Sequence, residues 1–160
     1  MSVLKYETAG PEETRALAAR LGERLKPGDV IALTGELGSG KTEFVRGLAQ
    51  GLMVPPEAAV ASPSFALAHE YMGRLKLVHL DLYRLPRVTP ELWPDLEDYL
   101  FGAHVTAVEW AERLEGFLPP DYLEVDLSIT GESRRSIVLT GHGPRGERLL
   151  RELSGIQALK

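Results

Sequence analysis

The chain has 160 residues and a mass of 17.6 kDa, the size of a single domain. It lacks cysteine, which excludes disulfides and thiolate metal sites, and its formal net charge of -5 disfavours direct binding to nucleic acid. Its apolar runs reach around six residues where a membrane helix needs roughly 20, and the N-terminus shows no secretion signal. We therefore expect one cytoplasmic domain over residues 1–160 that has no membrane contact and reaches RNA only through a partner.

The first half of the chain predicts alternating helices and strands. Residues 11–25 (PEETRALAARLGERL) predict a helix, because a proline and two glutamates begin it and leucines recur at helical spacing. The apolar run at 30–33 predicts a buried strand, and a helix is expected over 41–52 after a glycine-rich loop. Residues 65–84 (FALAHEYMGRLKLVHLDLYR) read as two strands around a turn at 72–73, which predicts an antiparallel hairpin.

The second half adds strands to the same sheet. Residues 90–101 (PELWPDLEDYLF) predict an interrupted helix, and residues 105–110 (VTAVEW) predict a buried strand that ends at a carboxylate. Residues 122–130 and 136–140 flank a GESR turn and predict a second hairpin, before a final helix at 145–154. The whole pattern predicts an α/β fold in which helices cover both faces of a mixed sheet.

The loop GELGSGKT satisfies the GxxxxGK[ST] pattern between a predicted strand and a predicted helix. Glycines let backbone N–H groups surround phosphate oxygens at the positive end of the following helix. Lys41 should then reach the β- and γ-phosphates, and the Thr42 hydroxyl should bind Mg²⁺. The residues of the loop expected to bind the nucleotide are Gly35, Glu36, Leu37, Gly38, Ser39, Gly40, Lys41 and Thr42.

This loop predicts a P-loop NTPase-like, three-layer α/β/α domain whose mixed sheet contains the two antiparallel hairpins. The chain has no asparagine, so it cannot form the Asn-Lys-x-Asp element that usually selects guanine. We therefore expect ATP and ADP as ligands, together with Mg²⁺.

Two carboxylates end apolar runs in the way that P-loop enzymes require. Asp81 follows LKLVHL and Glu109 follows VTAV, so both should lie at the edge of the sheet beside the loop. We expect Lys41, Asp81 and Glu109 to serve catalysis, and Thr42, Glu109 and Asp81 to serve the metal. Whether Asp81 binds the metal directly or positions water stays open, and each acid alone is also compatible with an ordinary polar strand end.

Other polar and aromatic residues carry weaker signals. The segment Ser62, Pro63, Ser64 and Phe65 follows the P-loop helix where related folds place a γ-phosphate switch, although it is equally a turn entering a strand. The four histidines show no ligand spacing, which favours packing or surface positions over metal binding. Trp110 reads as a core aromatic that gains interest from its neighbour Glu109.

Four motifs in order, LTGELGSGKTEFVRGL, SPSFALAHEY, HLDLYRL and VEWAERL, resemble the TsaE family, also called YjeE. They extend over roughly residues 30–115. These bacterial ATPases are required for threonylcarbamoyladenosine modification of tRNA. The resemblance implies an ATP- and magnesium-binding protein that works with TsaD, which transfers the threonylcarbamoyl group, and with TsaB, the noncatalytic partner of TsaD.

Carried over by position, the resemblance implies that Lys41 contacts phosphate, Thr42 and Glu109 hold magnesium, Asp81 orients water or lies in an outer shell, and Trp110 flanks the site. Residues 62–65 correspond to the family's switch, with Ser64 at a position that usually holds threonine. Glu43 likewise replaces a common threonine, with no evident consequence. Adenine contacts are expected near residues 10–13 and 131–135.

Two rival functions stay open at this point. A small-molecule P-loop kinase would need an acceptor pocket and an arginine-rich lid, for which Arg134, Arg135 and Arg145 are the candidates. A nucleotide-dependent interaction module would use the same loop and switch without hydrolysis. The chain has glutamine only at positions 50 and 157, so no glutamine near 62–84 can orient water, and slow hydrolysis by the isolated protein is expected. Arg84, in DLYR, is the alternative, as an arginine that acts in cis.

Overall fold

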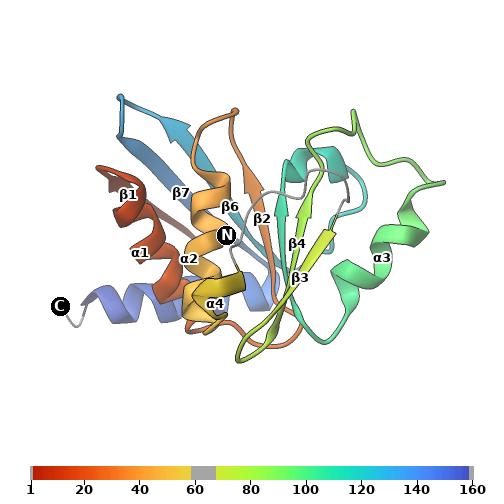
Figure 1. The fold of residues 1–160 in the computed structure, drawn as a ribbon, viewed down its shortest axis with the longest axis horizontal. Helices are drawn as coiled ribbons and strands as arrows, with labels where there is room; N and C mark the ends of the chain where they lie inside the picture. Colours follow the sequence, from red (N-terminus) through yellow and green to blue (C-terminus); the bar gives the residue numbers. More distant parts are fainter. Residues whose placement is uncertain (1, 59–67, 159–160) are drawn as a thin grey trace.

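The computed structural model describes residues 2–58 and 68–158, and it contains a seven-stranded sheet flanked by helices (Figure 1). The strands are β1 (Val3–Thr8), β2 (Val30–Thr34), β3 (Ala68–Met72), β4 (Lys76–Asp81), β5 (Val105–Glu109), β6 (Tyr122–Ile129) and β7 (Arg135–His142). The helices are α1 (Pro11–Gly22), α2 (Lys41–Gly51), α3 (Trp93–Phe101) and α4 (Gly143–Ala158), with short 3-10 helices η1 (Pro56–Ala58) and η2 (Ala111–Leu114). The predicted switch, residues 62–65, lies outside the described residues.

The strand order is β1-β7-β6-β2-β5-β4-β3, with a parallel centre and antiparallel flanks. Strands β6, β2, β5 and β4 are parallel neighbours, whereas β3, β7 and β1 join by antiparallel pairing. The register places Glu109 beside Leu33 on one side and beside Asp81 on the other. The carboxyl ends of β2, β5 and β4 therefore meet at one edge, and the predicted mixed sheet with two antiparallel hairpins is confirmed.

Hydrophobic cores lie on both faces of the sheet, which confirms the three-layer prediction. One cluster joins α1, α2 and α4 to the strands and contains Phe44, the largest fully buried side chain. The other packs α3 and η2 against β2, β4 and β5. Figure 1 shows α1 and α2 side by side over one face, while α3 lies beyond the β3 and β4 edge.

The boundaries of the predicted elements differ from the observed ones at several ends. Helix α1 begins at Pro11 with glutamates in its first turn, as predicted, but ends at Gly22, and Leu25 is buried beyond it in a turn. Helix α4 extends over 143–158. The predicted strand over 105–110 ends at Glu109, because Trp110 adopts a left-handed backbone conformation that leaves the ladder.

Strand β1 was not predicted from the sequence. It forms the edge of the sheet by pairing with β7, which lies almost at the other end of the chain. Leu4 and Tyr6 pack partly against the core, whereas Val3, Lys5 and Glu7 are exposed. Leu4 and Tyr6 alternate with Lys5 and Glu7 at the period of a strand, but the run is only six residues long and its pairing depends on a partner distant in sequence.

Helices α1 and α2 pack with their backbones in unusually close approach. A Cβ atom added at Gly51 would lie 2.3 Å from the Ala19 carbonyl oxygen and 2.8 Å from Gly22 Cα. A Cβ at Gly47 would lie 2.4 Å from the Arg15 carbonyl oxygen. These small residues let α1 fix the position of α2, whose first turn carries the P-loop lysine.

Gly51→Ala is therefore expected to lower the free energy of unfolding by about 1–3 kcal/mol, because the new methyl group meets backbone atoms that cannot rotate away. The measurement is chemical denaturation followed by circular dichroism. Gly155→Ala is the matched control, since nothing lies within 4 Å of its Cβ position in α4, and alanine there should stabilise the helix by about 0.5–1 kcal/mol. Equal stability of Gly51→Ala and the unmodified protein would show that the two helices separate easily.

Candidate functional site

The glycine loop between β2 and α2 has the backbone of a phosphate-binding loop. Gly35, Gly38 and Gly40 have φ angles of 143°, 81° and 107°, which favour glycine. At Gly35 a Cβ would lie 2.5 Å from the Leu127 carbonyl oxygen and 2.6 Å from Ser39 Oγ, so the loop can close only without a side chain there. Helix α2 then begins at Lys41, and its first N–H groups, which have no partners within the helix, form a positive end.

Lys41 is folded back over this loop. Its side chain is 4% exposed, and its Nζ donates hydrogen bonds to the carbonyl oxygens of Gly35 at 2.5 Å and Glu36 at 3.0 Å. The same Nζ lies 4.0 Å from the centre of the Trp110 ring, a distance typical of a cation–π contact. The ammonium group therefore sits at the centre of the loop, where an anionic ligand is attracted.

The charges around Lys41 oppose the effect of its burial. Desolvation lowers the pKa of the Lys41 ammonium, and the carboxylates of Glu109, Glu112, Asp81 and Glu36 act in the opposite direction. The loop therefore presents one buried cation on which four carboxylates act. Such a site suits a ligand that brings phosphate groups together with a divalent cation.

Thr42 and Glu109 are in direct contact, which joins the start of α2 to the end of β5. The Thr42 hydroxyl lies 3.0 Å from each carboxylate oxygen of Glu109, which is 3% exposed. His79 in β4 completes the group, because its Nε2 lies 2.6 Å from Glu109 Oε2. The sequence placed His79 among packing or surface residues, and the lone histidine inside an apolar strand gave no signal that it contacts a site acid.

Asp81 lies at the end of β4, directly beside Glu109 in the register. Its Oδ1 accepts a hydrogen bond from the Tyr83 backbone N–H at 3.0 Å, which bends the chain away from the strand. The two predicted acids are thus neighbours at one edge of the sheet.

Trp110 follows Glu109 with a φ angle of 60°, which is uncommon for a bulky residue. Lys41 and Arg113 both contact its ring, the Cζ of Arg113 lying 5.4 Å from the ring centre, and the Tyr83 ring lies 5.1 Å away. The tryptophan is therefore part of the wall around the lysine.

Arg135, at the start of β7, holds the tip of the loop. Its Nε donates to the Ser39 carbonyl oxygen and its Nη2 to that of Gly38, each at 3.1 Å. It also donates to carbonyl oxygens of its own hairpin, including that of Arg134 at 2.8 Å. The hairpin at 131–135 therefore adjoins the loop. Arg135 donates to five carbonyl oxygens in all, so each nitrogen of its guanidinium group has a partner.

Glu43, two residues after the P-loop lysine, is held by arginines. Arg15 of α1 donates to its Oε2 at 2.5 Å, and Arg46 of α2 pairs with its Oε1. The carboxylate in the first turn of α2 is thereby neutralised and linked to α1. No pattern in the sequence explains this glutamate, because one of its partners lies 28 residues away.

The donors around Thr42 suit magnesium. Among residues 2–58 and 68–158 no group of three or more histidine, cysteine or acidic side chains could form a complete metal cage. Mg²⁺ in nucleotide sites takes oxygen ligands from one or two protein side chains and from the substrate phosphates. The Thr42 hydroxyl and the carboxylates of Glu109 and Asp81 offer such oxygens beside the loop.

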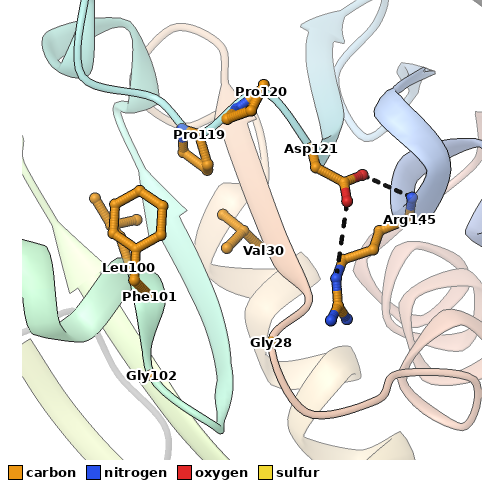
Figure 2. A pocket seen from close by; sticks show the side chains of 9 residues that line it. All are labelled: Gly28, Val30, Leu100, Phe101, Gly102, Pro119, Pro120, Asp121 and Arg145. Carbon is orange, nitrogen blue, oxygen red and sulfur yellow. Dashed lines mark hydrogen bonds and ion pairs between the residues drawn. The ribbon is translucent and has the colours of Figure 1, made fainter.

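A separate cavity of about 250 Å³ lies at the opposite edge of the sheet (Figure 2). It is lined by Gly28, Val30, Leu100, Phe101, Gly102, Pro119, Pro120, Asp121 and Arg145. In Figure 2 Asp121 and Arg145 contact each other, and Arg145 also pairs with the buried Asp29. Gly28 lies just before β2 and Val30 begins it, whereas the glycine loop follows the end of this strand. At about 3.3 Å per residue, the strand places roughly 16 Å between the cavity and the loop.

Two of the three candidate lid arginines are engaged elsewhere in the fold. Arg145 lines this cavity, beside the start of β2. Arg135 is bound to the loop backbone instead of standing over it as a mobile lid.

The parallel sheet centre, the glycine loop before α2 and the acid that meets the first helical threonine define a P-loop NTPase-like α/β protein. A sequence profile described as "Threonylcarbamoyl adenosine biosynthesis protein TsaE" matches residues 8–137. The chain belongs to the TsaE family, whose members act in biosynthesis of threonylcarbamoyladenosine in tRNA.

Individual relatives agree over most of the chain. It is 41% identical over 155 residues to the tRNA threonylcarbamoyladenosine biosynthesis protein TsaE of Bacillus subtilis, with 96% of each chain covered. The protein of the same name from Nostoc sp. is 41% identical, with 85% of each chain covered. The crystal structure of Bacillus subtilis YdiB matches with a TM-score of 0.80 and 37% identity, over 98% of this chain and 97% of that one. Within the described part of this chain, no helix is long and apolar enough to cross a membrane.

Proposed function

We propose that the chain supports threonylcarbamoyladenosine modification of tRNA by binding and hydrolysing ATP with Mg²⁺, and that it does so in the cytoplasm by acting on the TsaB and TsaD proteins. The contact of the Thr42 hydroxyl with both oxygens of Glu109, beside the loop lysine, carries the proposal. A helix-capping glycine loop has no need of a buried acid on its first threonine. A nucleotide site needs that pair of oxygen ligands.

Each residue has a role that follows from its position. The loop amides and Lys41 bind the β- and γ-phosphates, and Thr42 and Glu109 hold the cation that the phosphates bring. A Mg²⁺ ion held there would neutralise charge on the transferred phosphoryl group. Asp81, at the neighbouring strand end, orients the attacking water or a ligand water, and Trp110 covers the lysine from the side.

The role of the protein on its partners is inferred from the arginines near its loop. Among the described residues, Arg113 and Arg135 both donate to backbone carbonyls, so neither is poised over a phosphate, and the exposed Arg84 is the candidate for an arginine that acts in cis. P-loop enzymes with an incomplete site often receive an arginine from a partner, with rate gains of roughly 10³ to 10⁵. We therefore assign the activating group to the TsaB and TsaD complex, and contact with tRNA to those partners, because this chain is acidic.

The isolated protein is expected to hydrolyse ATP slowly, and addition of TsaB and TsaD together should raise the rate by at least about tenfold. Steady-state phosphate release at saturating Mg-ATP measures both rates, with the partners alone as the blank. A fast rate that the partners leave unchanged would contradict the proposal. Absence of hydrolysis in both mixtures, combined with tighter partner binding in ATP than in ADP, would favour an interaction module that does not hydrolyse.

A further inference from the structure

His79 is a fully buried histidine that forms a hydrogen bond with Glu109 of the candidate site. It lies in β4 with 0% of its side chain exposed, and its Nε2 is 2.6 Å from Glu109 Oε2. A carboxylate can only accept a hydrogen bond, so Nε2 carries the proton and donates it. The contact crosses from β4 to β5, which are adjacent parallel strands in the sheet.

The other ring nitrogen has no comparable role. Among the described residues, His79 Nδ1 is buried and has no hydrogen-bond partner. Burying a polar atom without a partner costs free energy, and an apolar side chain would fill the same place between the strands without that cost. The bond from Nε2 to Glu109 is the one contact of His79 with the described residues that an apolar side chain could not supply.

That bond fixes the orientation of Glu109. One carboxylate oxygen of Glu109 receives the His79 proton, and both oxygens lie 3.0 Å from the Thr42 hydroxyl. Donors on two sides, one from β4 and one from α2, restrict rotation of the carboxylate about its own axis. The side chain is thereby held toward Thr42, the other oxygen ligand proposed for the cation.

We propose that His79 is a positioning residue that orients Glu109 for a divalent cation bound with the nucleotide. The inference rests on the proposed function, in which Thr42 and Glu109 hold Mg²⁺. Groups that hydrogen-bond to metal ligands typically change metal affinity by 10- to 100-fold when they are removed. His79 meets that description without touching phosphate or metal.

The test uses His79→Leu, which removes both nitrogens, and His79→Gln, which keeps an N–H donor of similar reach. The full-length proteins are titrated with a fluorescent ADP analogue in EDTA, and then with MgCl₂ at fixed analogue. For His79→Leu, the Mg²⁺ concentration at half-saturation should rise by about 10- to 100-fold, while analogue affinity in EDTA stays within about twofold. His79→Gln should recover most of the Mg²⁺ affinity.

His69→Leu is the matched control, because His69 lies beside His79 in the β3 and β4 register but bonds to the Tyr71 hydroxyl. It should leave the Mg²⁺ titration unchanged. In a Glu109→Ala background, His79→Leu should add no further shift, since its effect passes through that carboxylate.

Three results would overturn the inference. The first is an unchanged Mg²⁺ concentration at half-saturation in His79→Leu. The second is an equal loss of analogue binding with and without Mg²⁺, and the third is failure of both His79 variants to fold. Either of the last two would show that His79 serves the packing of the core. If the unmodified protein binds no analogue, or binds it without any effect of Mg²⁺, the proposed function itself fails.

Discussion

Lys41→Ala is expected to weaken binding of ATP and ADP by at least about 100-fold while the domain remains folded. Its ammonium supplies a positive charge inside the glycine loop. Without it, only the N-terminus of α2 would attract the negative charges of the phosphates. Equilibrium titration with a fluorescent ATP analogue, with and without Mg²⁺, measures the loss.

The lysine also connects parts of the loop, so its removal has a cost in stability. It donates to the carbonyl oxygens of Gly35 and Glu36 and covers the Trp110 ring, and loss of such charged hydrogen bonds should cost about 1–3 kcal/mol. Thermal unfolding separates this effect from the loss of affinity. Lys76→Ala is the control, because Lys76 pairs with the exposed Glu70. Undiminished affinity in Lys41→Ala would remove the basis for a nucleotide site.

Glu109→Gln should reduce Mg-dependent ATP hydrolysis by about 100-fold or more while nucleotide binding in EDTA is unchanged or stronger. The glutamine keeps the shape of the side chain but loses the charge that the cation and the transition state require. Binding without metal should not suffer, because the Glu109 carboxylate acts on the Lys41 ammonium and its removal leaves a more positive loop.

The decisive comparison is between hydrolysis and metal-free binding in the same preparation. The hydrolysis assay should use the protein with TsaB and TsaD present, so that a 100-fold loss stays measurable. Glu124→Gln is the control variant, since Glu124 of β6 pairs with His142 of β7. Full activity of Glu109→Gln in excess Mg²⁺ would reduce Glu109 to a structural acid at the end of a strand.

The parts of the fold that the sequence predicted are those decided by neighbouring residues. The P-loop and the start of α2 follow from glycines, a lysine and a threonine within eight positions, and the buried runs of β2 and β5 follow from their own apolar residues. The strand ends at Asp81 and Glu109 were expected to meet because parallel neighbours end at one edge, and the register places them together.

What the sequence did not predict depends on partners far along the chain. His79 reads as a packing residue until the strand order places Glu109 beside it, and Glu43 has no visible reason until Arg15 of another helix reaches it. Arg135 reads as one of several hairpin arginines, and only the closed sheet brings it to the loop carbonyls. The roles of the site residues stay predictions that the variants above test.

The pairing of β1 with β7 also bears on how the protein is made. Val3 pairs with Thr140, so β1, the first strand to leave the ribosome, cannot pair until β7, the last strand, has been synthesised. At about 5–20 residues per second the delay is on the order of ten seconds. During that time the half-apolar β1 has no strand to pair with, and the sheet acquires its edge only when synthesis is nearly complete. Assembly of this domain is therefore largely a post-translational event, governed by a contact of high sequence separation.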